Sequence, residues 1–210
     1  MARDGSLAYP PEARQAAPAA SWWSRWRTAL GNRRQHRATA RALYAAVVQQ
    51  ARLPVFYAEW GVPDSRDGRL ELVTAHAILV MRRLQSEGAA GAALAQALFD
   101  VLFADLDRHL REWGVADLSV GKEMKKLAQS FYGRASALDA LLDGRDPPAL
   151  DAVLRRNVYT EARSPSDLAV RRLGAYLCAQ ARFLTSQDGA DLLAGRLCFA
   201  APEQLLDDKS

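Results

Sequence analysis

The sequence predicts an all-α protein, in which a single compact multi-helix domain follows a disordered N-terminal tail and a short Trp/Arg-rich helix. Apolar side chains recur with a period near 3.6 residues along most of the chain. No segment shows the sustained apolar–polar alternation of a strand, and no internal repeat is present. With 210 residues, half of them apolar, the chain can bury one sizeable helical core.

The first 36 residues differ from the rest in composition. Residues 1–20 are rich in Ala and Pro and contain a single Leu, so we expect a disordered tail. Residues 21–36 form a basic Trp-rich segment that suits a membrane or ribosome surface. Its predicted contact residues are Trp22, Trp23, Trp26, Arg25 and Arg27. Packing of this segment against its own domain and cleavage as a transit peptide are the alternatives.

The helical domain is predicted to span residues 37–200, and residues 201–210 are expected to be a flexible C-terminus. Stretches with helical periodicity are separated by glycine or proline residues, which interrupt helices. Long helices are expected at residues 37–53, 65–86, 92–112, 120–143 and 165–185.

Helix boundaries follow from capping residues. Asp64 and Ser119 are predicted to be N-cap residues, and Gly114 is predicted to end the helix before it. The sequences DPPALD at 146–151 and SPSD at 164–167 each place a capping side chain before a proline, which is tolerated at the first helical position. They predict two further helix starts.

The net charge of +4 arises from one segment of the chain. Six arginines and no acid lie between residues 22 and 41, whereas residues 42–210 hold 20 of the 28 bases and 22 of the 24 acids. The domain therefore lacks the general basic surface of nucleic-acid-binding proteins, and we expect no DNA partner.

Membrane insertion and export are not expected. The longest apolar run, at 72–81, is interrupted by His76 and is shorter than the roughly 18 residues that a span requires. The N-terminus lacks the apolar core of a secretory signal. Cys178 and Cys198 lack metal or redox spacing, which predicts two buried or half-buried thiols in a reducing compartment.

No motif predicts enzymatic chemistry, a metal or a cofactor. The nucleotide-binding and nucleophile motifs are missing, and His76, which lies on an apolar face, is interpreted as a core residue with satisfied hydrogen bonds. Asp100, Asp105 and Asp107 are five and two residues apart, so they do not share a helix face for magnesium. A prenyl-transferring enzyme is a remote alternative.

Asp105 is predicted to face the protein interior, because helical spacing places it among apolar residues. A buried carboxylate requires a partner, and the candidates are His109, Arg108, Arg69 and Arg134. We predict a buried polar network of Asp105, His109 and Arg69. Whether it is structural or contacts a partner is left open.

Basic and aromatic side chains gather around the turn GVADLSVG at 114–121. Such a surface is typical either of a solvated helix face or of a protein-docking patch. The predicted partner-binding residues are Arg108, Arg111, Lys122, Lys125, Lys126, Tyr132 and Arg134.

Two long blocks carry a family resemblance. The run LFADLDRHLREWGVADLSVGKEMKKLAQSFYGR and the run YAEWGVPDSRDGRLELVTAHAILVMRRL at 57–84 resemble the ubiquinol-cytochrome c chaperone family, the assembly factors of respiratory complex III. The resemblance covers roughly residues 37–185. It implies an all-helical, non-enzymatic protein without cofactors that binds newly made cytochrome b.

The resemblance also implies partners and a location. In mitochondria, the family member works with a small helical partner at the ribosomal tunnel exit. For this chain we expect a client-binding chaperone in the bacterial cytoplasm, with possible sites of contact at the ribosome and the inner membrane; the need for a small partner is open. A mitochondrial setting, and a peripheral membrane scaffold or adaptor that acts through the Trp/Arg helix, are the alternatives.

Overall fold

The structure is a computed structural model that describes residues 33–112, 114, 116–162 and 165–207. All regular secondary structure within these residues is helical, which confirms the predicted fold class. The tail at 1–20 and the contact residues Trp22, Trp23, Trp26, Arg25 and Arg27 lie outside the described residues.

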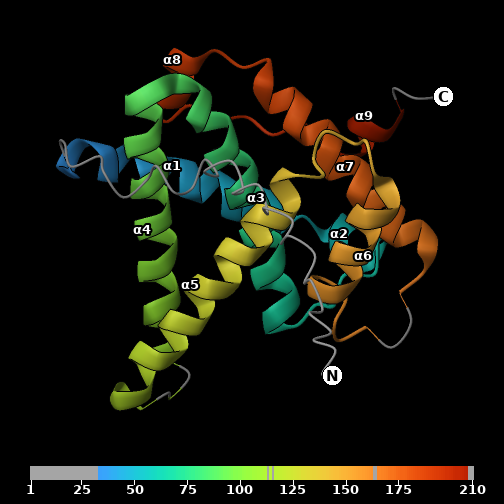
Figure 1. The fold of residues 1–210 in the computed structure, drawn as a ribbon, viewed down its shortest axis with the longest axis horizontal. Coiled ribbons are helices and arrows are strands. Elements are labelled where there is room, and N and C mark those ends of the chain that lie inside the picture. The colour runs from blue at the N-terminus through green and yellow to red at the C-terminus, as the bar shows by residue number, and fades with distance from the viewer. Residues whose placement is uncertain (1–32, 113, 115, 163–164, 208–210) are drawn as a thin grey trace, which may run out of the picture.

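The five long helices that the periodicity predicts are present, together with shorter ones (Figure 1). The elements are α1 (Arg33–Ala51), α2 (Pro54–Ala58), α3 (Arg66–Leu84), the 3₁₀ turn η2 (Gln85–Glu87), α4 (Gly88–Glu112), α5 (Asp117–Asp139), α6 (Pro147–Asn157), α7 (Asp167–Thr185), α8 (Gly189–Leu193) and α9 (Pro202–Asp207).

Some predicted helix caps are correct and others are displaced by one or two residues. Asp146 caps α6 by accepting a hydrogen bond from the backbone N–H of Ala149 at 3.0 Å, as predicted. Helix α5 starts before Ser119, with Ala116 at its N-cap position. The N-cap of α7 is Ser166, the second serine of SPSD, so this helix starts beyond the proline.

The predicted cap at Asp64 is wrong. Ser65 caps α3 instead, because its Oγ accepts the N–H of Gly68 at 3.1 Å. Asp64 is exposed and pairs with Arg69 across a distance of 2.6 Å between Oδ1 and Nε. The backbone of Pro63 packs closely against Gly68, since a Cβ at this position would lie 2.1 Å from the carbonyl oxygen of Pro63.

Two glycines with left-handed backbone conformation shape the centre of the fold. Gly88 (φ 62°) follows η2 and turns the chain back from α3 into α4. Gly114 (φ 79°) lies just beyond the end of α4 and terminates this helix, as predicted. By length and composition alone, the continuous helical stretch Arg66–Glu112 would suffice for a membrane span. In the fold, this stretch bends at η2, and most residues of its α3 half are buried.

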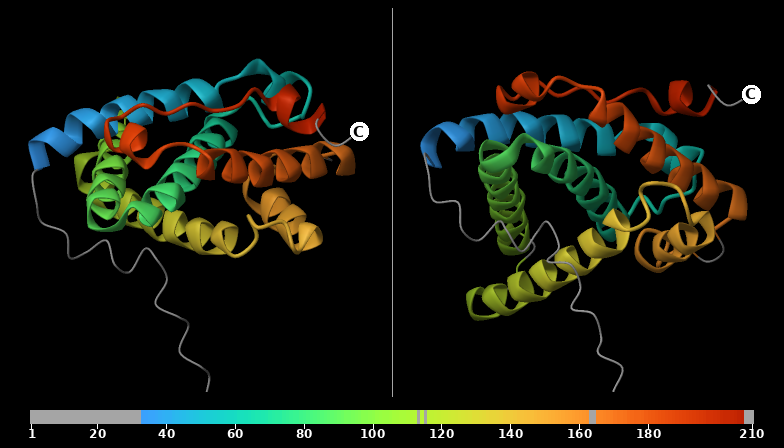
Figure 2. Two further views of the ribbon diagram at one scale, coloured as in Figure 1. Left: turned by 90° about the horizontal axis from the view of Figure 1, so that it is seen from above. Right: turned by 45° about the horizontal axis from the view of Figure 1, so that its top comes forward.

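The helices are arranged around α3 and α4. Figure 2 shows α1 and the C-terminal segment on one side of the molecule and α5 and α6 on the opposite side. The side chains of Phe56, Leu72, Ile78, Leu98 and Tyr176 are essentially inaccessible to solvent and lie in one continuous core. This core joins α2, α3, α4 and α7.

A chain of hydrogen bonds crosses the core and confirms that His76 is a satisfied core residue. Its Nδ1 donates to the carbonyl oxygen of Leu72 at 2.7 Å, and its Nε2 accepts from the Tyr176 hydroxyl at 2.8 Å. Gln50 Nε2 donates to the Tyr176 oxygen at 2.9 Å. This order of donors requires neutral imidazole, and burial lowers the pKa of His76 to about 4.

The C-terminal region differs from two predictions. Residues 202–207 form the short helix α9, and Pro202 at its start is buried. The segment before α9 packs on the core, where the carbonyl oxygen of Ala200 accepts a hydrogen bond from Gln50. The thiol of Cys178 is buried as predicted, whereas Cys198 is exposed. Neither cysteine forms a disulfide.

Candidate functional site

The helices α4 and α5 form a hairpin whose tip projects from the body of the molecule (Figure 1). An aromatic cluster holds the two helices together. Phe99 stacks on Phe103 (ring centroids 4.2 Å apart) and on Tyr132 (5.5 Å), and it meets the edge of Phe131 at 5.2 Å. Tyr132, a predicted partner-binding residue, is therefore half-buried in the hairpin rather than projecting from it.

Three of the six cations in the predicted basic patch, Arg108, Arg111 and Lys126, are already paired with acids on the same helix. Arg111 Nε lies 2.8 Å from Asp107 Oδ2, and Lys126 Nζ lies 2.8 Å from Glu123 Oε1. These pairs are spaced by four and three residues, which brings the two side chains together on a helix surface. The pairing lowers the pKa of Asp107. The charge of these cations is largely neutralised within the hairpin.

Lys122 and Lys125 differ from the other cations of the hairpin. Both are exposed on α5, one turn apart, and neither forms an ion pair within the described part of the chain. Of the predicted partner-binding residues, these two present the least compensated charge to a partner.

Asp105 forms a half-buried polar network at the contact between α1 and α4. Its side chain is 20% exposed and pairs with Arg108, and its Oδ2 lies 3.5 Å from His109 Nδ1. Tyr44 of α1, which the sequence did not suggest, donates its hydroxyl to Oδ2 at 2.8 Å. Burial raises the pKa of Tyr44, and the hydrogen bond to Asp105 raises this pKa further.

The prediction that Arg69 belongs to this network is wrong. Arg69 lies at the start of α3, is 55% exposed and pairs with Asp64. Its guanidinium carbon also lies 5.8 Å from the centre of the Tyr57 ring. Helical periodicity places Arg69 on the solvent side of α3, so it cannot reach a carboxylate on the α1 side of α4.

Arg134 also departs from its predicted role at an open surface. It crosses from α5 to α3 and forms a two-pronged ion pair with Glu71, in which Nε lies 2.6 Å from Oε2 and Nη2 contacts Oε1. The side chains of Arg134 and Glu71 are 24% and 10% exposed. Burial raises the pKa of Glu71, whereas Arg134 acts in the opposite direction.

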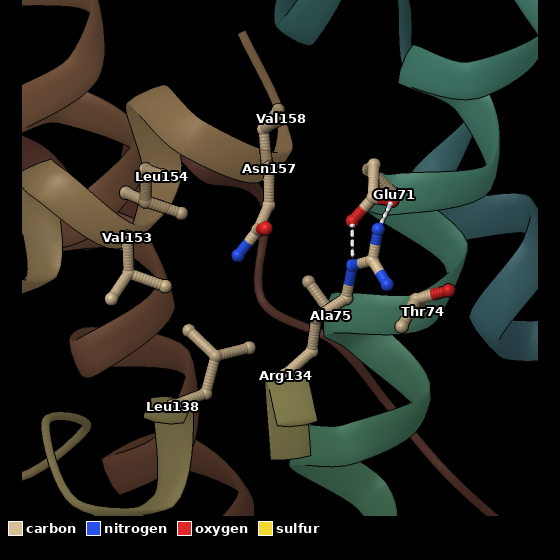
Figure 3. Close-up of a pocket in the computed structure, with 9 residues that line it drawn as sticks. All are labelled: Glu71, Thr74, Ala75, Arg134, Leu138, Val153, Leu154, Asn157 and Val158. Carbon is tan, nitrogen blue, oxygen red and sulfur yellow. Dashed lines mark hydrogen bonds and ion pairs between the residues drawn. The ribbon is translucent and has the colours of Figure 1, made fainter. Parts of the chain in front are cut away.

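Two hollows lie on either side of the Glu71–Arg134 pair. Both are small; one is bounded by α3, α4 and α5, and the other is bounded by α3, α5 and α6. Figure 3 shows the second hollow, with Asn157 across from the ion pair. Sequence reasoning missed Glu71, although it falls on the same face of α3 as the buried Ala75 and Ile78, one and two turns on.

Metal chemistry finds no support in the geometry. Across the ranges that the structure describes, no three His, Cys, Asp or Glu side chains lie close enough together to hold a metal ion.

Comparison with known proteins identifies the family. A sequence profile described as ubiquinol-cytochrome C chaperone matches residues 58–199, a range that includes the hairpin and both hollows. The chain belongs to this family. The match confirms the resemblance that the two sequence blocks indicate.

Individual members of the family extend the comparison. The chain is 21% identical over 151 residues to ubiquinol-cytochrome-c reductase complex assembly factor 1 of Xenopus laevis, covering 72% of this chain and 74% of that protein. It is also similar to the crystal structure of the Cbp3 homolog from Brucella abortus, with a TM-score of 0.73 and 37% identity. That similarity covers 81% of this chain and 93% of the solved one.

Proposed function

We propose that this protein is a non-enzymatic assembly chaperone of the ubiquinol-cytochrome c reductase complex and that it binds newly made cytochrome b. The observation that supports this most strongly is the family match over residues 58–199, together with a similar fold and 37% identity to the bacterial Cbp3 homolog. The family and the assembly factor of Xenopus laevis support the assembly role, and cytochrome b as the client is our proposal.

The hairpin tip is proposed as one contact surface for the client. Lys122 and Lys125 are the exposed cations best suited to acidic groups of a partner, because no acid in the described residues neutralises them. Arg108, Arg111 and Lys126 would contribute only by exchanging their present carboxylate partners. Arg134 and Tyr132 would act by fixing the hairpin rather than by touching an incoming acidic group.

The remaining expectations concern location and further partners. A bacterial cytoplasmic chaperone would meet its client at the inner membrane or near the ribosomal tunnel exit. The Trp-rich segment at 21–36 is the proposed contact with either surface, because tryptophan and arginine suit interfaces between apolar and charged surroundings. Co-purification with the tagged protein tests for a small helical partner subunit.

An in-cell crosslinking experiment tests this function. A photoreactive amino acid replaces Lys125 in the tagged protein, and proteins crosslinked in the native host are identified by mass spectrometry. We expect recovery of newly made cytochrome b. The variant K122E/K125E should reduce this recovery, and K126E is the matched control because Lys126 is already paired with Glu123.

Two outcomes would contradict the proposal. Recovery of membranes or another complex without cytochrome b would exclude cytochrome b as the client and favour a membrane scaffold. A scaffold would also lose its activity when residues 1–36 are deleted, whereas a client-binding chaperone should keep its client. Equal recovery for K122E/K125E and the unaltered protein would remove the hairpin tip from the contact surface.

A further inference from the structure

The chain between α8 and α9, residues 195–201, crosses the body of the molecule as a strap that forms no helix of its own. Figure 2 shows it returning from α8 alongside α7, on the side of the molecule where α1 lies. Ala200 of the strap is buried, and the ring of Phe199 meets the ring of His76 edge to face, with 5.5 Å between their centroids. The strap therefore covers part of the core.

Two glutamine side chains hold the backbone of the strap. Gln187, just beyond the end of α7, binds Cys198 through both ends of its amide. Its Nε2 donates to the carbonyl oxygen of Cys198 at 2.7 Å, and its Oε1 accepts from the N–H of Cys198 at 3.1 Å. Gln50 of α1 donates to the carbonyl oxygen of Ala200 at 3.2 Å and to the hydroxyl oxygen of Tyr176 at 2.9 Å. The strap is thus fixed near both Gln187 and Tyr176.

Gln180 lies on α7 between these two points. It is one turn beyond Tyr176 on the same face of the helix and two turns before Gln187. Its side chain is fully buried, and neither Nε2 nor Oε1 has a hydrogen-bond partner among the described residues. Burial of an unpaired amide costs free energy, because both of its groups bind water when they are exposed.

The closed position of the strap is therefore subject to opposing contributions. Burial of Ala200, of Pro202 and of part of Phe199 favours it, as do the bonds to Gln187. The unpaired amide of Gln180 opposes it, because lifting the strap would return water to this group. Segments with few buried contacts open at a lower free energy than the helices of a core.

We propose that the strap opens together with α9 while the other helices stay folded. Gln187 is the latch of this device, and Gln180 is the group that limits the stability of the closed state. Opening uncovers the edge of the core at His76 and Tyr176, between α1 and α7. The inference concerns the chain by itself and does not depend on the identity of the client.

Hydrogen exchange of the full-length protein, followed by mass spectrometry, tests the opening. Peptides from residues 196–207 report on the strap and α9, and peptides from α3 report on the core. We expect the strap and α9 to exchange through an opening that low concentrations of urea hardly accelerate. Exchange in α3 requires global unfolding, which urea promotes. The same urea dependence in both regions would overturn the inference.

Substitutions of the two glutamines should shift the opening in opposite directions. Q187A removes the latch and should speed exchange in α9, whose amides Gln187 does not bind, by about tenfold. Q180M removes the unpaired amide at similar volume and should slow exchange in the strap and α9 by about tenfold. Q85M removes a buried, unpaired amide nitrogen in η2 and is the matched control, which should leave exchange in the strap unchanged.

The variants also define what would contradict each role. Slower exchange in α3 but not in the strap of Q180M would place Gln180 beneath the helices and remove it from the device. Unchanged exchange of α9 in Q187A would exclude Gln187 as the latch. Thermal unfolding followed by circular dichroism establishes that all three variants are folded.

Discussion

The α4–α5 hairpin and the core around α1, α3 and α7 differ in where their polar side chains find partners. In the hairpin, Arg111 and Asp107 pair along one helix, and their side chains are 50% and 37% exposed. In the core, His76 is fully buried and its bond to Tyr176 joins residues 100 positions apart. Apart from Arg134, the paired cations of the hairpin find their acids on the same helix, whereas the core depends on partners supplied by other helices.

This difference indicates where the molecule can change without unfolding. An exposed ion pair on a helix contributes only about 0.2–1 kcal/mol, because water solvates both charges once the pair is broken. A buried hydrogen-bonding group that loses its partner costs about 1–3 kcal/mol. The hairpin surface can therefore adapt to a partner, while the core around His76 maintains the fold.

The largest expected effect comes from removing an aromatic ring in the core. Phe56 is fully buried and contacts the rings of Trp60, His76 and Tyr176 at centroid distances of 5.2–5.6 Å. F56A should lower the free energy of unfolding by about 3–5 kcal/mol. The matched variant F103A, in the half-buried hairpin cluster, should lose about half as much. Equal losses in chemical denaturation would contradict the contrast between the two regions.

The Glu71–Arg134 pair joins α3 of the core to α5 of the hairpin. It tests whether the contribution of the pair to stability comes from neutralising its own two charges. R134M leaves Glu71 buried without its counter-charge, and we expect a loss of about 3 kcal/mol in the free energy of unfolding at neutral pH. E71L/R134M should recover to within about 1 kcal/mol of the unaltered protein, because neither charge remains.

Both variants are compared by urea denaturation. Because burial raises the pKa of Glu71, protonation at lower pH should relieve part of the loss in R134M. A double variant as unstable as R134M would show that the ion pair does more than neutralise its own charges.

The third prediction concerns pH and the core. Folding lowers the pKa of His76 from 6.5 to about 4, so the unfolded chain binds a proton that the folded chain excludes between these values. Stability from neutral His76 is complete above pH 6.5 and is lost as the pH falls toward 4. At pH 5 the loss is about 2 kcal/mol.

Denaturation curves between pH 7 and pH 5 measure this loss. H76Q cannot titrate, so the part of the pH dependence that His76 causes should disappear in this variant. An identical pH slope in H76Q and the unaltered protein would show that other groups cause the acid sensitivity.

The smallest effect on stability is expected at the hairpin tip. K122E/K125E changes two exposed cations without an ion pair and should alter the free energy of unfolding by less than about 0.5 kcal/mol. K126E breaks the pair with Glu123 and should cost about 0.3–0.5 kcal/mol. Thermal melts of both variants provide the comparison. A large destabilisation by K122E/K125E would mean that the tip is part of the fold rather than a free surface.

Features that depend on neighbours along the chain were predictable from the sequence. The long helices follow from apolar periodicity, and Asp146 and Gly114 mark helix ends through capping geometry that needs only a few residues. The pairing of Asp105 with Arg108 and His109 follows from spacings of three and four residues. The two family blocks were also identifiable, because they are long and ordered.

Features that depend on which helices meet were not predictable. Arg69 was assigned to Asp105, but Tyr44 of α1 takes that place. Arg134 was expected at a surface, yet it pairs with Glu71 of α3. In both cases the partner lies more than sixty residues away along the chain, and helical periodicity specifies which face is buried without specifying against which helix.

The sequence by itself determined the all-α class, the positions of the long helices, the family and the placement of His76 in the core. These follow from local periodicity and from the cost of leaving a buried polar group unsatisfied. Tertiary structure alone decided that Tyr44 bonds to Asp105, that Arg134 pairs with Glu71 of α3, and that small hollows flank this pair. These depend on the packing of α1, α3, α4, α5 and α6, because ion pairs and hollows between helices arise only when separate helix faces are brought together.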